Sequence, residues 1–369
     1  MATGHTEAVL VAAFSPDGRQ LATGGGDATL RLWDILTETP LATLTGHTNW
    51  ILCAAWSPDG KRLATGGMDK DVRIWDPVTG QAIGKPLKRH TKWVNALAWE
   101  PLHLNPDCVR VASAAKDGTI KVWDSLRGHL LFSLSGHAAS VTSLKWSGQG
   151  FLISGSQDRT IRVYNASEGG KLVRVLAGHA HWVNSLSLNT DYVLRTGAHD
   201  HTGKSPATKE EAQQAAMQRW LAVTQGKPEK LVSCSDDHTL FLWEPASSKK
   251  PLIRMTGHQQ QVNITSFSPD GRLIASASFD KSIKLWDSNG KFLGNLRGHV
   301  GAVYQIGWAA DSRMLVSGSK DSTLKIWDTR TKKIKTDLPG HADEVYAVDW
   351  SPDGERLVSG SKDCLVKML

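Results

Sequence analysis

The sequence predicts an all-β fold, a β-propeller of eight four-stranded blades with a short helical insertion in the fifth blade. Three observations predict it. A pattern of His, a hydroxyl residue, Asp and an aromatic residue recurs along the 369 residues with a period near 42. Short apolar stretches with strand-like alternation separate these marks. One insertion interrupts the repeat, and its composition favours a helix.

The repeat has fixed internal spacing. In each unit the hydroxyl residue precedes the Asp by four residues, and the aromatic position follows the Asp by six. The His lies 18 residues before the hydroxyl in five of the units. The units are His5, Thr23, Asp27 and Trp33; His47, Thr65, Asp69 and Trp75; His90, Ser113, Asp117 and Trp123; His137, Ser154, Asp158 and Tyr164; His179, Ser233, Asp237 and Trp243; His258, Ser276, Asp280 and Trp286; His299, Ser317, Asp321 and Trp327; and His341, Ser359, Asp363 and Leu369.

Each unit contains residues that resemble a hydrolase triad, as in His299, Ser317 and Asp321. An enzyme needs one nucleophile in one cleft, whereas a repeated fold needs the same buried polar network in every unit. In such a network the carboxylate accepts from the imidazole N–H and from the hydroxyl, and the imidazole accepts from the indole N–H. The sequence therefore predicts structural tetrads and no enzyme. The aromatic position of these tetrads also explains most of the Trp excess, because it holds six of the 15 Trp residues.

The unit that begins at His299 shows the expected strands. Alternating apolar residues predict strands at 302–308, 314–319, 322–327 and 333–338, with turn residues between them. One blade cannot bury both of its faces, so it needs a neighbour on each side. Residues 1–369 are therefore expected to form a single propeller of eight blades.

The last blade lacks a fourth strand of its own, because the chain stops after its third. Propellers of this kind close when an N-terminal strand completes the last blade. Only residues 1–3 precede the first Gly-His pair. The closing strand is therefore expected to be short or missing, in which case the chain is a fragment or another segment completes the blade.

The fifth unit carries an insertion at 190–230, between its first and second strands. Thr208 and Glu211 form a capping-box pattern, which predicts a helix at 208–223. Ala212, Ala216 and Trp220 share one face of that helix. Two interpretations are open: a partner-docking element, or a helix that packs against the side of the propeller.

The overall composition is that of a globular protein with a moderate basic excess. There are 43 Lys and Arg residues against 36 Asp and Glu, a net charge of +7. This balance favours an acidic partner such as nucleic acid without establishing one. The four Cys residues are scattered and have no ligand spacing, which favours reduced thiols in an intracellular compartment. No apolar run has the length of a membrane span.

Two sets of positions are expected to form a binding surface on the narrow face of the ring, where the Gly-His segments lie. The residue three positions after the His is Trp in three units, and surface Trp is enriched in binding hot spots. The alternative is that these rings cap the loops. The position two residues further on holds Asn95, Asn184, Asn263, Tyr304 and Tyr346, and the position just before the Asp holds Met68, Lys116, Gln157, Phe279, Lys320 and Lys362. The candidate partner-binding residues are Trp50, Trp93, Trp182, Met68, Lys116, Phe279, Tyr304, Lys320, Tyr346 and Lys362.

These marks resemble the WD-repeat family, whose units build four-stranded propeller blades. Gly-His precedes the first strand of seven units, SPDG occurs at 15–18, 57–60, 268–271 and 351–354, and Trp-Asp closes five units. Stretches outside these marks resemble the Notchless family of ribosome-assembly proteins more specifically. They include WEPLHLNPDC (99–108), DYVLRTGA (191–198), LRGHVGAVYQIGW (296–308) and DLPGHADEVYAVDWSPDG (337–354).

The resemblance implies a non-enzymatic assembly factor of the large ribosomal subunit, located in the nucleus and nucleolus. It implies docking of the propeller faces on the pre-ribosomal particle, with assembly proteins and rRNA as partners. In the family an N-terminal ubiquitin-like domain engages the midasin ATPase, and that domain is absent from this sequence. The alternative is a signalling or ubiquitin-ligase adaptor that recognises peptide motifs. We expect a monomeric propeller with no cofactor, metal or membrane contact.

Overall fold

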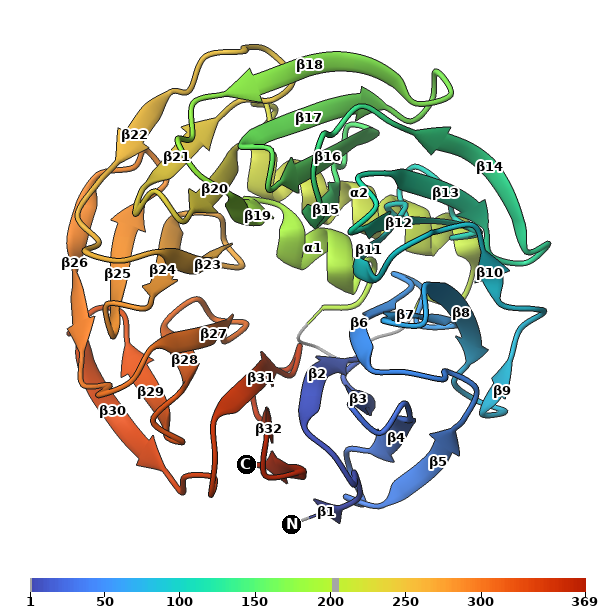
Figure 1. The fold of residues 1–369 in the computed structure, drawn as a ribbon, viewed down its shortest axis with the longest axis horizontal. Coiled ribbons are helices and arrows are strands. Elements are labelled where there is room, and N and C mark those ends of the chain that lie inside the picture. The colour runs from blue at the N-terminus through green and yellow to red at the C-terminus, as the bar shows by residue number, and fades with distance from the viewer. Residues whose placement is uncertain (1, 201–205) are drawn as a thin grey trace.

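The computed structural model describes residues 2–200 and 206–369, and these form a ring of eight sheets around a central channel (Figure 1). The predicted eight-bladed β-propeller is therefore confirmed. Each sheet is one blade, and its first strand lies at the channel while its last strand lies at the outer wall (Figure 1). All strand pairs within the blades are antiparallel, as in β27 (Val303–Trp308) and β28 (Met314–Ser319).

The blades are numbered in chain order, and their strands are short because each one crosses the ring from face to face. Blade 1 consists of β2 (Val9–Phe14), β3 (Gln20–Gly25), β4 (Leu30–Asp34) and β5 (Pro40–Leu44). Blade 2 consists of β6 (Ile51–Trp56), β7 (Leu63–Gly67), β8 (Asp71–Asp76), β9 (Gln81–Ala82) and β10 (Leu87–Lys88). Blade 3 consists of β11 (Val94–Trp99), β12 (Arg110–Ala115), β13 (Ile120–Asp124) and β14 (His129–Leu134). Blade 4 consists of β15 (Val141–Trp146), β16 (Phe151–Ser156), β17 (Thr160–Asn165) and β18 (Lys171–Ala177).

The second half of the ring repeats this plan. Blade 5 consists of β19 (Val183–Leu188), β20 (Leu231–Ser235), β21 (Leu240–Trp243) and β22 (Ile253–Met255). Blade 6 consists of β23 (Val262–Phe267), β24 (Leu273–Ser278), β25 (Ser282–Asp287) and β26 (Phe292–Arg297). Blade 7 consists of β27, β28, β29 (Leu324–Asp328) and β30 (Lys333–Leu338). Blade 8 consists of β31 (Val345–Trp350), β32 (Leu357–Ser361), β33 (Leu365–Met368) and the N-terminal strand β1 (Ala2–Thr3).

The short strand β1 closes the ring. Ala2 pairs with Val366 and Thr3 with Leu365, so the N-terminal strand is the fourth strand of blade 8. The closing strand expected to be short or missing is thus present, with two residues. Its pairing gives the edge of β33 the backbone partners that an exposed strand edge lacks.

The hydrophobic core lies between neighbouring blades, not inside a single one. Between blades 6 and 7, for example, Ile283 and Leu285 of one blade pack with Val303, Leu315 and Trp327 of the next. Similar clusters lie between successive pairs around the ring, as in blades 4 and 5. Each blade therefore buries both faces against its neighbours, which is why closure of the ring stabilises all of them together.

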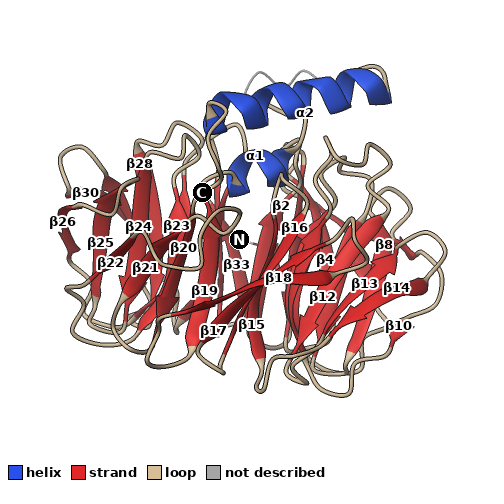
Figure 2. Ribbon diagram, turned by 90° about the horizontal axis from the view of Figure 1, so that it is seen from above, coloured by secondary structure: helices blue, strands red, loops and turns tan. Residues whose placement is uncertain are grey.

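The insertion in blade 5 contains two helices, α1 (Asp191–Thr196) and α2 (Lys209–Thr224). The sequence predicts a helix at 208–223, and α2 begins after the capping box in which Thr208 and Glu211 bond to each other's backbone. Helix α1 was not predicted from the sequence. Residues 201–205 of the insertion lie outside the described residues. Both helices lie on one face of the ring (Figure 2).

Helix α2 packs on the propeller through the face that carries Ala216 and Trp220. Ala216 is buried with Leu102 and Cys108, which belong to the loop between β11 and β12. The Trp220 ring stacks on His103 with centroids 5.2 Å apart. Of the two open interpretations, packing against the propeller is therefore observed, on a face of the ring. The opposite side of α2, with Met217 and Leu221, is exposed.

A buried carboxylate fixes this packing. Glu229 accepts hydrogen bonds at Oε1 from the Trp220 indole (2.8 Å), the Thr190 hydroxyl (2.7 Å) and the Gly148 backbone N–H (3.0 Å). Its side chain lies between the end of the insertion and blade 4. One acidic group thus ties α2, the start of α1 and the neighbouring blade together.

Candidate partner-binding site

Each tetrad is a chain of buried hydrogen bonds. In blade 7 the Trp327 indole donates to Ser317 Oγ (2.8 Å), which lies 2.7 Å from His299 Nε2, and His299 Nδ1 lies 2.9 Å from Asp321 Oδ2. The Asp321 carboxylate can only accept, so His299 carries its proton on Nδ1 and donates it to Oδ2. The unprotonated Nε2 then accepts from the Ser317 hydroxyl, which in turn accepts from the indole N–H.

This order of hydrogen bonds differs from the one predicted from the sequence. The indole donates to the hydroxyl and not to the imidazole, because the hydroxyl lies between the two rings. The tetrad hydroxyl donates to the imidazole and not to the Asp. Blade 2 shows the same order: Trp75 donates to Thr65 (2.8 Å), Thr65 bonds to His47 (2.8 Å), and His47 to Asp69 (2.7 Å).

Two blades depart from the tetrad at its aromatic end, with Tyr164 in blade 4 and Leu369 in blade 8. The His–hydroxyl bond is present in both, at 2.8 Å for His137 with Ser154 and 2.8 Å for His341 with Ser359. The imidazole and hydroxyl are thus the common part of the network, and the indole is an additional donor in the remaining six blades.

The tetrad carboxylate also accepts from the turn around it. In blade 3, burial by itself raises the pKa of Asp117, but hydrogen bonds from the Thr119 hydroxyl and from the backbone N–H groups of Thr91 and Thr119 outweigh it. Together with the charge of His90, they hold the pKa of Asp117 at about 2. The carboxylate stays ionised at neutral pH and ties the two loops of the blade together.

The tetrad hydroxyls have no access to a substrate. Ser317 and its counterparts in the other seven blades are 0% exposed, and each is committed to its imidazole. A serine nucleophile needs an open path to the acyl group that it attacks. The network therefore has the properties of a structural element in every blade.

The face that carries the Gly-His segments, here called the GH face, holds all ten candidate partner-binding residues. The residue three positions after each tetrad His accepts a backbone hydrogen bond from the residue just before the Asp. In blade 3 this joins Lys116 N–H to the Trp93 carbonyl (2.8 Å), and in blade 8 it joins Lys362 to Glu344 (3.0 Å). Two loops of each blade thereby present their side chains together.

The three tryptophans of this face are partly exposed. Trp50, Trp93 and Trp182 retain 41, 39 and 44% of their surface, whereas the tetrad tryptophans are buried. The Lys116 ammonium lies 4.1 Å from the centre of the Trp93 ring, a cation–π contact that positions both. Met68 is half-buried beside Trp50, to whose carbonyl its backbone N–H bonds at 2.8 Å.

The aromatic residues of blades 6–8 form a separate cluster on the same face. The Tyr304 ring lies 5.9 Å from Phe279 and 5.6 Å from Tyr346, measured between centroids. Both tyrosine hydroxyls donate to Glu344 Oε2, at 3.0 and 3.1 Å. Burial and the neighbouring Glu344 carboxylate raise the pKa of Tyr304 to about 12.

The aromatic residues of the GH face are therefore spread over blades 2, 3, 5 and 6–8. Trp50 and Trp93 belong to neighbouring blades, and Trp182 belongs to blade 5, where it contacts His181 with centroids 5.3 Å apart. Lys362 is paired with Asp343 (3.2 Å), and Lys320 is exposed on blade 7. Glu344, which joins the two tyrosines, was not among the predicted site residues, although it occupies the same repeat position as the three tryptophans.

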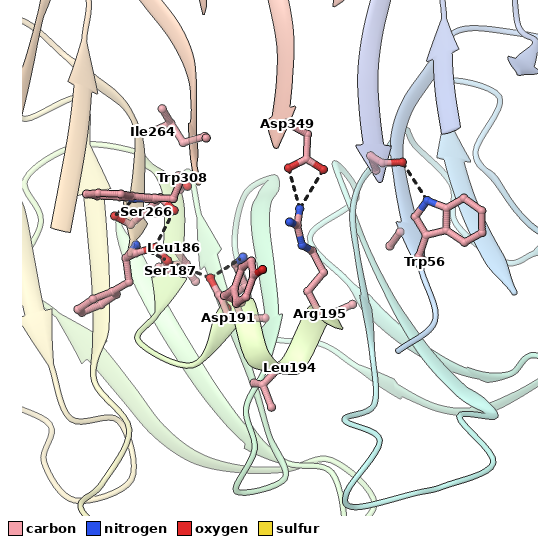
Figure 3. A pocket seen from close by; sticks show the side chains of 18 of the residues that line it. Trp56, Leu186, Ser187, Asp191, Leu194, Arg195, Ile264, Ser266, Trp308 and Asp349 are labelled. Carbon is pink, nitrogen blue, oxygen red and sulfur yellow. Dashed lines mark hydrogen bonds and ion pairs between the residues drawn. The ribbon is translucent and has the colours of Figure 1, made fainter. Parts of the chain in front are cut away.

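Helix α1 lies on the opposite face (Figure 2), over the central opening of the ring (Figure 1), and Figure 3 shows its Arg195 directed at Asp349. The Arg195 guanidinium bonds to both oxygens of Asp349 in blade 8, at 2.8 and 3.0 Å, and Asp191 pairs with Lys145 of blade 4 at 2.8 Å. The cavity beneath has a volume of about 460 Å³ and is lined by the first strands of the blades. Helix α1 thus spans the channel from blade 4 to blade 8.

The side chains that could ligate a metal are dispersed over the described residues, 2–200 and 206–369. No group of three or more His, Cys, Asp or Glu side chains in these residues is arranged to hold a metal ion. All four cysteines are free, and burial raises the pKa of the Cys53 thiol to about 12. No described helix has both the length and the apolar character needed to cross a membrane.

A ring of eight β-sheet blades with a buried polar network in each is the architecture of a repeat propeller. The chain belongs to the WD40 family: the model described as "WD domain, G-beta repeat" matches residues 1–34, 38–76, 81–124, 128–165, 170–204, 249–287, 290–328 and 331–368. These eight matches follow the eight repeat units of the sequence.

Among curated proteins, the chain is similar to several with related names. It is 52% identical over 275 residues to Protein Notchless of Drosophila melanogaster (73% of this chain, 56% of that protein). It is 54% identical over 297 residues to Ribosome assembly protein 4 of Saccharomyces cerevisiae (79% and 58%), and 56% identical over 291 residues to the Notchless protein homolog of Arabidopsis thaliana (79% and 61%). The chain spans about three-fifths of the length of these relatives.

The fold also matches a solved structure. The computationally designed Ika8 protein superposes with a TM-score of 0.77 at 28% sequence identity, over 99% of this chain and 96% of that one. This likeness extends over the whole ring of blades.

Proposed function

We propose that this propeller is a non-enzymatic scaffold that docks on precursors of the large ribosomal subunit, with the GH face as its protein-binding surface. The observation that carries the proposal is the group of partly exposed tryptophans on that face. The fold does not need these rings, because the tetrads and the strands between blades supply the core. An exposed ring held by a neighbouring lysine, as Trp93 is, suits a hot-spot contact.

The names of the relatives supply the biological setting. Proteins called Ribosome assembly protein 4 and Notchless are more than half identical to this chain over three-quarters of its length. Assembly of large-subunit precursors implies action in the nucleus and nucleolus, with assembly proteins and rRNA as partners. In this proposal, contact with the midasin ATPase belongs to the ubiquitin-like domain that the resemblance implies, not to the propeller.

The test is sedimentation of the tagged chain from a cell lysate through a density gradient. We expect a fraction of it to co-migrate with large-subunit precursors. The double variant Trp50→Ala, Trp93→Ala should shift toward the top of the gradient. A matched control, Leu36→Ala with Val78→Ala, removes two apolar side chains that are 77 and 86% exposed in turns of the opposite face, and it should sediment like the unmodified chain.

Two results would count against the proposal. If the chain is found only at the top of the gradient, the adaptor function is favoured, in which the same face recognises peptide motifs. If both double variants behave like the unmodified chain, the tryptophans are loop caps and the docking surface lies elsewhere.

A further inference from the structure

The net positive charge of the chain is concentrated in one sector of the ring. Residues 249–338, which form the outer strand of blade 5 and all of blades 6 and 7, contain 15 Lys and Arg against 7 Asp and Glu. The adjoining segments 339–369 and 1–44, which form blades 8 and 1, contain 5 basic and 11 acidic residues. The net charge of +8 in the first sector thus exceeds the +7 of the whole chain, and the adjoining sector is acidic.

The cations of this sector are exposed and mostly unpaired. Two of its basic side chains are paired with carboxylates: Arg272 with Asp270, and Lys325 with Asp337. The remaining exposed ones on the outer strands and their turns form no ion pair with any described residue. We call them the basic rim: Lys249, Lys250, Arg254, Lys291, Arg297, Arg330, Lys332, Lys333 and Lys335.

Contacts between blades make the basic rim continuous along the outer wall. Gly290 of blade 6 packs closely against Ile253 of β22 in blade 5, since a Cβ atom at this glycine would lie only 2.5 Å from the Ile253 side chain. These two residues are the chain neighbours of Lys291 and Arg254. From blade 7, the Lys332 ammonium bonds to the Leu293 carbonyl of β26. The strands β22, β26 and β30 therefore lie side by side at the left of Figure 1.

The nearby carboxylates are occupied within the turns. Asp287 accepts from the backbone N–H groups of Asn289 and Lys291 (2.9 and 2.8 Å), and Asp328 accepts from those of Arg330 and Thr331 (2.8 and 2.8 Å). These acids hold the backbone that presents the lysines. The Lys332 ammonium bonds to the Leu293 carbonyl and that of Lys335 contacts Met314 Sδ, but no rim cation is neutralised by a carboxylate of the described residues, so the exposed side chains can neutralise an external anion.

One aromatic ring lies within the basic rim. Phe292 of β26 is 47% exposed, follows Lys291 in the chain, and has the Lys284 ammonium 5.5 Å from its centre. Cations along a wall with an exposed ring among them are the features with which proteins hold a nucleic-acid backbone and stack a base.

From these features we propose that the basic rim of blades 5–7 binds the phosphate backbone of RNA. The cations are spread along a wall across three blades, which matches a repeated phosphate charge. A protein partner would be expected to use a central apolar anchor, and a flat membrane would reach only part of a curved wall. The acidic sector of blades 8 and 1 repels phosphate, so it limits the bound strand at one end.

The proposal deepens the proposed function, because it assigns an RNA-binding surface separate from the GH face. The test uses the whole chain and a fluorescein-labelled single-stranded RNA of 20 nucleotides, with anisotropy measured at 50, 100 and 200 mM KCl. We expect binding that weakens steeply with salt, since each neutralised phosphate contributes roughly 0.7 to the slope of log K against log salt.

The decisive comparison is between two variants of equal net charge. The rim variant carries Lys250→Glu, Lys291→Glu, Lys333→Glu and Lys335→Glu. The control carries Lys61→Glu, Lys85→Glu, Lys171→Glu and Lys227→Glu, which are also exposed but lie outside the sector. The rim variant should lose at least about tenfold in affinity at 100 mM KCl and about three units of salt slope, whereas the control should lose less than about threefold.

Three outcomes would overturn the proposal. Equal losses in the two variants would mean that net charge alone attracts the RNA. Binding of labelled polyglutamate as tight as that of RNA would assign the rim to an acidic protein, and preferential binding of anionic vesicles would assign it to a membrane. Since the assay contains no ribosomal particle, a failure here leaves the gradient test of GH-face docking unaffected. Unchanged thermal unfolding of both variants would show that they fold.

Discussion

Ser317 is the side chain on which the blade-7 tetrad depends, because it is at once the acceptor for Trp327 and the donor to His299. The sequence predicts that these four residue types satisfy one another, and it does so correctly because their spacing repeats. It does not predict the order of the bonds. That order follows from where the rings lie in space, with the hydroxyl between indole and imidazole.

We expect Ser317→Ala to destabilise the protein by about 2–4 kcal/mol, because it leaves two buried ring nitrogens without a partner. Trp327→Phe removes one donor and keeps most of the ring, so its cost should be smaller. Urea unfolding followed by tryptophan fluorescence measures both. Ser247→Ala, at an exposed turn, is the control and should change stability by less than about 0.5 kcal/mol. A Ser317→Ala protein as stable as the control would contradict this account of the tetrad.

The imidazoles give the stability a pH dependence. Burial, opposed by the paired carboxylate, lowers the pKa of His90 and His299 below 6.5, and the same holds for His5, His258 and His341. The unfolded chain then binds protons that the folded chain does not, so the contribution is complete above pH 6.5 and is lost as the pH falls below it.

Between pH 7.5 and 5.5 the free energy of unfolding should therefore fall by at most about 1.4 kcal/mol per pH unit for each histidine, and the urea midpoint should fall with it. The Asp117 carboxylate acts in a lower range, because its pKa of about 2 keeps it ionised there; its contribution is lost only below about pH 4. Unfolding curves at half-unit steps of pH measure the effect. A midpoint that is constant or rises toward pH 5.5 would show that the imidazoles are protonated in the fold.

At the scale of the element, α2 is the part of the fold for which sequence left two roles open. Its start was predictable, since Thr208 and Glu211 form a local capping box. The surface on which α2 packs was not predictable. The Trp220 side chain contacts Glu229 and His103, and both of these residues lie outside the helix. Helix α1 was missed entirely: six residues give too short an apolar pattern, and its anchors Lys145 and Asp349 lie in distant blades.

Trp220→Ala should release α2 from the propeller without unfolding the ring. It removes the stack on His103 and the indole donor to Glu229, a loss of roughly 3 kcal/mol. Limited proteolysis should then cut within 206–230 at least about tenfold faster, while the thermal midpoint of the propeller changes little. Leu221→Ala, on the exposed side of the same helix, is the matched control and should leave the cleavage rate unchanged. Equal rates for the two variants would contradict this packing role.

At the scale of the whole molecule, the ring couples the blades. Every blade shares its core with two neighbours, and β1 joins the first and last parts of the chain in blade 8. The eight blades were countable from the sequence because each carries its own His-to-Asp unit. Charge is also a property of this scale, since the basic rim emerges only when three blades are placed side by side.

Closure predicts one cooperative transition. Ser154→Ala in blade 4 and Ser359→Ala in blade 8 should each lower a single midpoint that is the same by far-UV circular dichroism and by tryptophan fluorescence. In an open array the blade next to the seam would unfold first. An early separate transition confined to the Ser359→Ala variant would therefore show that the two-residue strand β1 does not close the ring.

The sequence alone determined the repeat: the number of blades, their strands, the tetrad members, the capping box and the candidate residues of the GH face. These features depend on the spacing of residues along the chain, and that spacing recurs in every repeat unit. Only the tertiary structure decided the order of bonds in the tetrads, the presence of α1, the docking of α2 and the grouping of Tyr304 with Tyr346 around Glu344. The physical reason is that these features depend on positions in space. The order of the tetrad bonds follows from where the rings lie within each blade, and the anchors of α1, the contacts of α2 with blades 3 and 4 and the Tyr304–Tyr346 grouping join side chains from different blades, which no local pattern records.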